Sequence, residues 1–249
     1  MIRALLIRRF WLLGNNITSS VILSFLFPMI IFIFTNLAFR KILVGGIYDI
    51  KFDTWIYPSM VFLVSGFSII PSIFRDVFDL RIHKKVLTYL SLTPFSKRFL
   101  ISSFLVVSIT EGIIMGLISL LLYSFIIPYP FSLFETLILV FYLSIFSLFL
   151  GNIFITVSIL SDKSTTFFVS IFIIVFIILF GSGLVIALPF FPPSINNILS
   201  ILPIVMIVNA MQSHLFSGFI NWSLTLVPIL FSIGLLFINS ILLRKKLRQ

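Results

Sequence analysis

Charged residues are scarce in this 249-residue chain, and cysteine is missing altogether. Only 10% of the residues are Asp, Glu, Lys or Arg, whereas a soluble globular domain typically carries about 25%. This scarcity excludes a water-soluble globular domain, because a folded surface of this composition would expose mostly apolar side chains to water. The absence of cysteine excludes disulfide bonds, iron–sulfur ligation and thiol catalysis.

Apolar residues are abundant instead: 60% of the chain is hydrophobic, 32 residues are phenylalanine, and the mean hydropathy is +1.27. A helix needs about 20 mostly apolar residues to cross the hydrocarbon core of a membrane. We therefore predict an all-α, polytopic membrane protein with a single transmembrane domain over residues 1–249. The six predicted spans are Ile17–Phe39, Thr54–Phe74, Phe99–Ile127, Leu133–Leu160, Thr166–Leu188 and Trp222–Leu243.

The distribution of the basic residues predicts the orientation of the chain, whose net charge is +10. With the N-terminus inside, 14 of the 17 Lys and Arg residues lie inside and only Arg40, Lys41 and Lys51 lie outside. Cytoplasmic loops carry the excess of basic residues in membrane proteins. We therefore expect a multi-pass protein of the cell (inner) membrane with both termini in the cytoplasm. Nucleic-acid binding is not expected, because the sequence has no arginine-rich arm and no aromatic–basic interleaving.

Two segments outside the six spans are also expected to be helical. Residues 1–16 mix apolar residues with three arginines and a tryptophan, which predicts an interfacial helix lying flat in the headgroup region. The alternative is an extension of the first span. Residues 189–221 carry no Lys, Arg, Asp or Glu and are interrupted by four prolines. They predict a re-entrant or interfacial helical hairpin on the outer face.

Residues 75–98 hold eight of the chain's 24 charged residues between two apolar stretches. Within them Ile82, Val86 and Leu90 lie four residues apart, which predicts a short amphipathic helix. Ser96 is predicted to cap the helix of the third span. Membrane anchoring alone would explain the basic residues but neither the acidic residues nor the helical stripe. We therefore expect this cytoplasmic coupling loop to dock on a soluble partner.

The same loop resembles part of a known family. Its text "DLRIHKKVLTYLSLTPFSKR" is similar to the coupling helix of the integral membrane subunit of type 2 ABC exporters, with agreement at Leu87, Leu90, Thr93, Pro94 and Ser96. Lys85 stands where the family has glycine, and Thr88 where it has glutamate. In that family the loop fits into a groove of the ATPase subunit. The resemblance implies that the ATPase-coupling residues are Asp79, Arg81, Lys84, Val86, Leu87, Leu90, Thr93 and Pro94.

Two further features agree with this resemblance, which covers essentially the whole chain. The 1–16 helix has its counterpart in the family's connecting helix. The outer segment is similar to that of the family at Pro192, Pro193, Pro203, Val208, Ala210, Met211, Leu215 and Gly218, and departs from it at Leu202, Met206, Asn209 and Gln212.

The resemblance implies the transmembrane permease subunit of an ATP-driven exporter, which moves an amphiphilic, lipid-linked, polysaccharide or drug-like substrate out across the membrane. It implies a homodimer, or a heterodimer with a related permease, surrounded by membrane lipid and bound to separate ABC ATPase subunits. The chain itself has no GxxxxGK[ST] phosphate loop. We therefore expect it not to be an enzyme and to bind no cofactor, while ATP and magnesium are held by the partner ATPase.

Glu111 is the one carboxylate near the middle of a predicted span. A charged side chain at that depth costs roughly 2.5 kcal/mol or more, so it is not expected to face lipid. Two interpretations stay open: a place on the translocation path or its gate, and a neutral carboxyl hydrogen-bonded between helices. Ser108, Gly112 and Gly116 beside it form a small-residue stripe that predicts close helix packing. Asn152 in the fourth span is predicted to hydrogen-bond a neighbouring helix.

Two other classes of function are weighed against transport. A membrane-embedded lipid-modifying enzyme would need a converging polar constellation, and the aspartate pairs Asp49/Asp53 and Asp76/Asp79 are similar to those that bind magnesium pyrophosphate in membrane prenyltransferases. The charge distribution predicts these pairs on opposite sides of the membrane, where they cannot share a metal ion. No metal site is expected. A non-transporting membrane scaffold is the remaining alternative.

Overall fold

The computed structural model describes residues 1–15, 17–39, 50–91, 95–127 and 131–246, and these residues are helical almost throughout, with no β-strand among them. Its α-helices are α1 (Ile2–Asn15), α2 (Ile17–Phe32), α3 (Phe52–Ile73), α4 (Leu80–Ile82), α5 (Val86–Ser91), α6 (Lys97–Ile126), α7 (Leu133–Leu160), α8 (Ser164–Gly181), α9 (Pro193–Ser200), α10 (Pro203–Ser217) and α11 (Trp222–Lys246). The structure also contains two π-helical segments, η1 (Ile33–Leu37) and η2 (Phe74–Asp79), and one 3₁₀ turn, η3 (Leu188–Phe190).

Six helices are long and apolar enough to span a membrane, which indicates a membrane location and confirms the number of predicted spans. Two boundaries differ from the prediction by more than three residues. The second span continues as one helix from Phe52 to Ile82, because η2 carries α3 into α4 past the charged residues that were expected to end it. The fifth ends at Gly181 rather than Leu188, since the chain leaves the helix at Ser182 and Gly183 adopts a positive φ of 84°.

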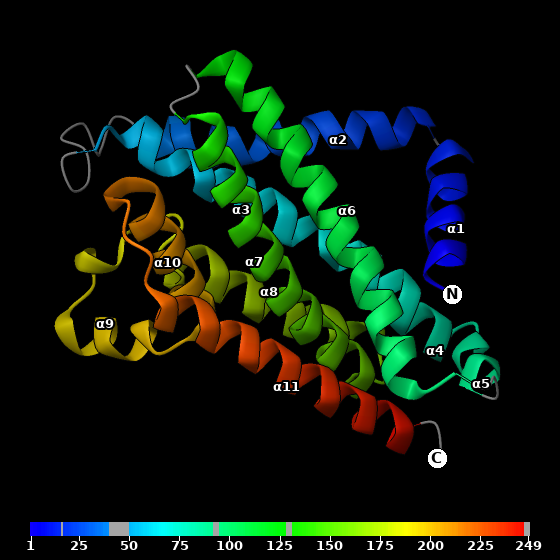
Figure 1. The fold of residues 1–249 in the computed structure, drawn as a ribbon. Helices are drawn as coiled ribbons and strands as arrows, with labels where there is room; N and C mark the ends of the chain where they lie inside the picture. The colour runs from blue at the N-terminus through cyan, green and yellow to red at the C-terminus, as the bar shows by residue number, and fades with distance from the viewer. Residues whose placement is uncertain (16, 40–49, 92–94, 128–130, 247–249) are drawn as a thin grey trace.

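The helix α3 lies at the centre of the bundle, whereas α2 lies on its surface. In the most apolar window of each span, 78% of the α3 residues are buried, against 17% for α2. Figure 1 shows α6, α7 and α11 running diagonally across the bundle, with α2 along one side and α1 meeting α2 at a steep angle. The apolar core is therefore built mainly by α3, α6, α7 and α10, while α2, α8 and α11 offer apolar side chains outward.

The bundle has two ends of different character. The basic end is defined here by α4, α5, the turn at 161–163 and the last turn of α11. The opposite end carries α9 and α10, which meet at an angle of 94°. One side of α10 is buried, whereas no residue of α9 is. This bent pair lies in the segment for which the sequence predicts a helical hairpin.

Small residues let α3, α6 and α7 approach closely. A Cβ atom on Gly112 would lie 2.9 Å from Ile69 Cγ1 and 3.2 Å from Ser65 Oγ. The hydroxyls of Ser65 and Ser147 lie 3.0 Å apart across the α3–α7 contact. The predicted small-residue stripe is thus confirmed as a packing surface.

Polar side chains inside the bundle join neighbouring helices and form the predicted cap. Asn239 Nδ2 of α11 donates to the backbone carbonyl oxygen of Asn152 over 3.0 Å and to its side-chain Oδ1 over 3.5 Å, and the second of these is the bond expected for Asn152. Thr156 Oγ1 donates to Asn239 Oδ1 over 2.7 Å and extends this contact. At the start of α6, Ser96 Oγ accepts from Phe99 N over 3.2 Å, which confirms the predicted N-cap.

We predict that Gly112→Val destabilises the bundle. The added side chain has to displace Ile69, and such overpacking costs about 1–3 kcal/mol. Thermal unfolding of the purified chain in detergent measures the effect. Gly234→Val in α11 is the matched control, because a Cβ there meets nothing within 4 Å. Equal unfolding temperatures for the two variants would contradict the close α3–α6 contact.

Candidate functional site

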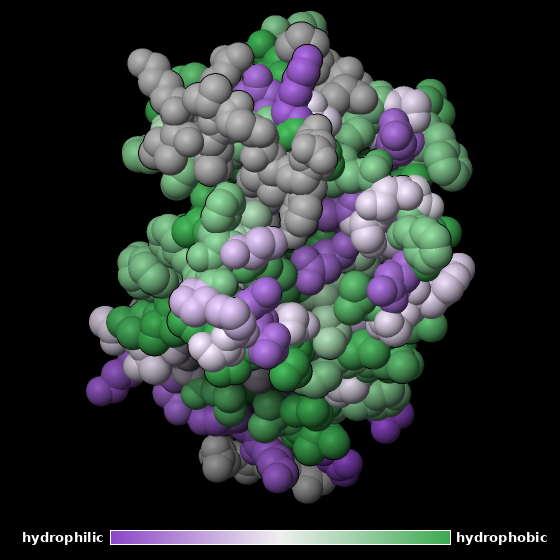
Figure 2. All heavy atoms as spheres, turned by 90° about the vertical axis from the view of Figure 1, so that its left-hand side faces the viewer, coloured by the Kyte–Doolittle hydropathy of each residue, from purple (hydrophilic) through white to green (hydrophobic). Residues whose placement is uncertain are grey.

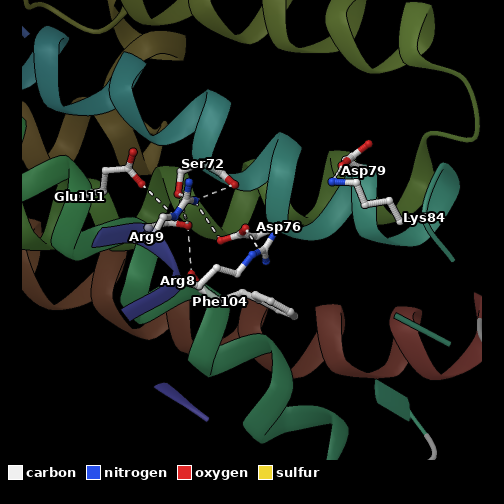
Figure 3. A network of polar contacts seen from close by, with 9 residues as sticks. Arg8, Arg9, Ser72, Asp76, Asp79, Lys84, Phe104 and Glu111 are labelled. Carbon is white, nitrogen blue, oxygen red and sulfur yellow. Dashed lines mark hydrogen bonds and ion pairs between the residues drawn. The ribbon is translucent and has the colours of Figure 1, made fainter. Parts of the chain in front are cut away.

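Arg9 of α1 is buried in the bundle, and its guanidinium contacts α3 and η2. Its side chain is 8% exposed. Nη2 donates to Asp76 Oδ2 over 2.9 Å and to the carbonyl oxygen of Ser72 over 3.0 Å, and it also contacts Ser72 Oγ. Figure 3 shows Arg9 between Ser72, Asp76 and Glu111, with Arg8 on the far side of Asp76. The α1 helix is therefore fixed to the second span by a buried ion pair.

Glu111 of α6 and Ser108 extend this contact to a third helix. Arg9 Nε lies 3.4 Å from Glu111 Oε2, an ion pair without hydrogen-bond geometry, and both atoms lack a hydrogen-bond partner among the described residues. The hydroxyls of Ser72 and Ser108 lie 3.2 Å apart. We call Arg8, Arg9, Ser72, Asp76, Ser108 and Glu111 the charged cluster. Glu111 thus lies between helices, and its closest charged neighbour there is Arg9.

The charged cluster balances its own charge. Arg8 Nη1 lies 3.4 Å from Asp76 Oδ1, so two guanidinium groups face two carboxylates. Removing one partner of a buried ion pair costs about 3–5 kcal/mol, because the remaining charge loses its compensation. The buried pair of Arg9 and Asp76 consequently contributes most to holding α1 against the second span, while Arg8 and Glu111, which are 36% and 27% exposed, contribute less.

The burial of Arg9 departs from what an interfacial helix gives its arginines. There the arginines would face water and the apolar side would enter the membrane. In the structure Arg9 is buried, whereas the apolar residues Phe10 and Trp11 are 80% and 77% exposed. The physical reason is Asp76: a counter-ion inside the bundle makes burial of an arginine favourable where hydrocarbon would oppose it.

The sequence reading places Asp76 in a water-exposed loop, and the structure corrects this. Asp76 is 2% exposed and lies in η2, within the continuous helix of the second span. A signal for the cluster was present in the sequence: Asp76 borders one apolar span, Glu111 lies within another, and arginines stand in the N-terminal segment. Their spacing does not say which arginine meets which carboxylate, since that depends on how α1 packs.

Residues 75–98, the expected coupling loop, contain the end of the second span and the separate helix α5 rather than one amphipathic helix. The helix of the second span ends at Ile82, and α5 begins at Val86 after a turn in which Lys85 has a positive φ of 54°. This turn breaks the four-residue stripe, because Ile82 and Val86 belong to different helices. Thr93 and Pro94 lie outside the described residues, as do the side chains of Thr88 and Leu90.

The turn also decides which residues of α5 can meet a partner. Leu87 is 1% exposed and packs in the core, so its predicted contact with an ATPase is not available in this conformation. Val86 and Tyr89 are instead 38% and 70% exposed. Tyr89 is therefore a docking candidate that the sequence prediction did not include, although its place three residues after Val86 on a helix marks it.

Arg81 is held by contacts inside the chain. Its Nη1 lies 3.1 Å from Asp162 Oδ1, while Nη2 donates to the carbonyl oxygens of Ser158, over 3.1 Å, and Ser161. Lys246 Nζ of α11 lies 2.9 Å from Asp162 Oδ2. Hydrogen bonds from Lys246 and Arg81 lower the pKa of Asp162 below its ordinary value. This cluster joins α4, the 161–163 turn and α11 at the basic end.

Two other predicted coupling residues pair with each other near the turn. Lys84 Nζ lies 3.0 Å from Asp79 Oδ2, and His83 Nδ1 lies 3.1 Å from Asp79 Oδ1. Lys84 and His83 remain about half exposed. Asp79 thus stabilises the turn, and the two basic side chains are presented at the surface of the basic end.

The opposite end carries a shallow polar cavity. Figure 2 faces this end and shows polar side chains gathered near the middle of the view, among hydrophobic ones. A cavity of about 360 Å³ lies between α3 and α10, and its polar lining includes Asn209, Gln212 and Ser213. Asn209 and Gln212 are two of the positions at which the sequence departs from the resembled pattern, and both contribute to this cavity.

The described residues do not form a metal centre. No three His, Cys, Asp or Glu side chains among them gather closely enough to hold an ion. Asp53 and Asp76 are separated by the length of α3 and η2, about 35 Å at 1.5 Å per residue, so they cannot share a metal ion. Asp49 lies outside the described residues.

The fold and the charged cluster together define an all-helical, multi-pass membrane protein whose N-terminal helix is joined to the bundle by buried ion pairs. Comparison with protein-family models gives no match for the chain, and comparison with curated proteins gives none either.

We predict that Arg9→Gln lowers the free energy of unfolding by about 3–5 kcal/mol, because Asp76 is left buried without its closest counter-ion. Adding Asp76→Asn to this variant recovers part of the loss. The double-mutant cycle of Arg9→Gln and Asp76→Asn gives a coupling energy of about 0.5–3 kcal/mol. Thermal unfolding in detergent measures both. Arg3→Gln, an exposed arginine on the same helix, is the control and leaves stability unchanged. Strictly additive effects would contradict the ion pair.

We predict that Asp162 gives the chain a small, pH-dependent stability. Because its pKa is lowered in the folded state, its ion pairs stabilise the fold above the ordinary value of 3.8, and this contribution is lost as the pH falls through the lowered pKa. Asp162 is 62% exposed, so the contribution is about 0.2–1 kcal/mol. The measurement compares unfolding of Asp162→Asn with the unchanged chain from pH 8 down to about pH 3. A difference that persists unchanged at the acid end would refute this assignment.

Proposed function

We propose that this chain is the permease subunit of an ATP-driven exporter of the type 2 ABC class. It crosses the cell membrane six times with both termini in the cytoplasm, and its basic end faces the cytoplasm. Residues 189–221 form a re-entrant hairpin on the outer face. The chain pairs with a second copy or a related permease, and separate ATPase subunits bind ATP and magnesium. The order of sequence features that resembles this class supports the proposal.

The arrangement of α3 and α5 at the basic end is the observation that carries the proposal. The second span runs without a break from Phe52 to Ile82, and a turn of three residues then leads into α5. Because α5 exposes Val86 and Tyr89 while Leu87 packs in the core, it has one side for a partner and one side fixed to the bundle. Force applied to α5 therefore reaches the whole second span.

The conformation of Lys85 supports the same reading. Its φ of 54° lies in the left-handed region, which costs a non-glycine residue about 1–2 kcal/mol. This is the position at which the resembled pattern has glycine. Glycine adopts a left-handed backbone without this cost, so the turn observed here suits the residue that the resembled pattern has at this position.

The ion pairs connect α5 and the second span to other helices, so that a movement of α5 is transmitted through the bundle. Displacement of α5 reaches α1 and α6 through Arg9, which contacts Asp76 and Glu111. It reaches α7 and α11 through Asp162. Closure of the two ATPases thus tilts several helices at once and opens the pathway outward, as rocking helix bundles do in other transporters. The uncharged 189–221 segment favours an amphiphilic or lipid-linked cargo over a small ion.

Co-purification from the cells that naturally produce the chain tests the proposal. The affinity-tagged chain should bring down an ABC ATPase, identified by mass spectrometry. We predict that Tyr89→Asp lowers its recovery about tenfold or more, since a charge replaces an exposed aromatic anchor without entering the core.

Phe190→Asp, which changes an exposed aromatic residue at the opposite end, is the control and keeps the ATPase bound. Recovery of the chain without any ABC ATPase would reject the exporter and leave the enzyme or scaffold alternatives. Retention of the ATPase by Tyr89→Asp would reject α5 as its docking element.

A further inference from the structure

A cavity of about 270 Å³ lies beneath the loosely packed α2, between α2, α3 and α6. Its lining is largely apolar and includes one ionisable group, Glu111. The side chain of Glu111 is 27% exposed: its Oε2 atom is buried and pairs with Arg9 Nε, and the exposed part of the side chain lines the cavity. An ionised carboxylate can accept about four hydrogen bonds, so the acceptor capacity of this one is largely unused.

The neighbours of Glu111 do not fill that need. Arg9 hydrogen-bonds Asp76 and Ser72, and it meets Glu111 only through the ionic contact of 3.4 Å. Lining residues Ser24 and Ser68 donate their hydroxyl hydrogens to backbone carbonyls of their own helices. A ligand that brings N–H donors would use the remaining acceptor positions of this carboxylate, and a positive charge on the ligand would strengthen those hydrogen bonds.

The cavity has a polar end and an apolar end. Along the helices, Ser20, Pro71 and Glu111 lie nearer the basic end. Phe27, Phe67 and Met115 lie nearer the middle of the bundle, and the Phe27 and Phe67 ring centroids are 6.1 Å apart. This order matches an amphiphile whose headgroup sits toward the basic end and whose chain points to the membrane interior. The two rings also offer faces that attract a cation.

We propose that this cavity binds an amphiphile with a primary ammonium headgroup, with Glu111 as its counter-ion and Phe27 and Phe67 along the start of its chain. A single positive charge fits better than a zwitterion, because no Lys or Arg among the described residues lines the cavity to receive a phosphate. The site is a property of the bundle and does not rest on the proposed export function.

Native mass spectrometry of the full chain in a non-ionic detergent tests the proposal. It compares the binding of two probes of equal chain length, dodecylamine and dodecanol. The unchanged chain should bind the amine about tenfold more tightly, the value of one charge-assisted hydrogen bond. Glu111→Gln should bind both probes equally. Glu135→Gln is the matched control: its carboxylate lies outside the cavity, and glutamine preserves the capping box with Ser132.

Ser24→Phe provides a second variant that keeps every charge of the cluster and fills the cavity. It should weaken dodecylamine binding about tenfold or more, by excluding the ligand from a space it needs. Equal binding of amine and alcohol to the unchanged chain, or an amine preference that survives either Glu111→Gln or Ser24→Phe, would overturn the site. Tighter binding of dihexanoyl phosphatidylethanolamine than of dodecylamine would overturn the assignment to a singly charged headgroup.

Discussion

The ion pair between Arg9 and Asp76 is the interaction on which the rest of this arrangement depends. An arginine enters an apolar bundle only where a carboxylate and hydrogen-bond acceptors receive it, and Asp76 and Ser72 provide both. The same pair permits the second span to continue helically through Asp76, which would otherwise be an unpaired charge. One contact therefore fixes the position of α1, the length of the second span and the place of the turn that leads to α5.

The buried face of α1 has a consequence for how the chain meets lipid. Because Arg9 points inward, Phe10 and Trp11 are left on the outer side of the helix, where acyl chains or the interface can receive them. The α2 helix that follows is mostly exposed and packs loosely, so the bundle keeps space beneath it beside Glu111. The charged cluster thus separates a tightly packed centre from a peripheral helix that lipid-like molecules can reach.

Much of this fold follows from the sequence, because membrane spans are determined by local composition. The six spans, the cap at Ser96 and the hydrogen bond at Asn152 depend on residues close in sequence or on general rules for bundles, and all were predictable. The burial of Arg9 and of Leu87 was not predictable from the sequence. The first depends on which helix α1 packs against. The second depends on the left-handed turn at Lys85, for which lysine gives no signal. Sequence periodicity cannot report a rotation introduced between two short helices.

The most direct measurement of the central claim is a distance between α1 and α6. The chain has no cysteine, so spin labels can be placed through Ile7→Cys and Val106→Cys alone, at two exposed positions. Pulsed electron paramagnetic resonance should give one narrow distance distribution, because the charged cluster holds α1 in a single position. In an Arg9→Gln background the distribution should broaden as α1 is released. An equally narrow distribution at the same distance in that background would contradict the account.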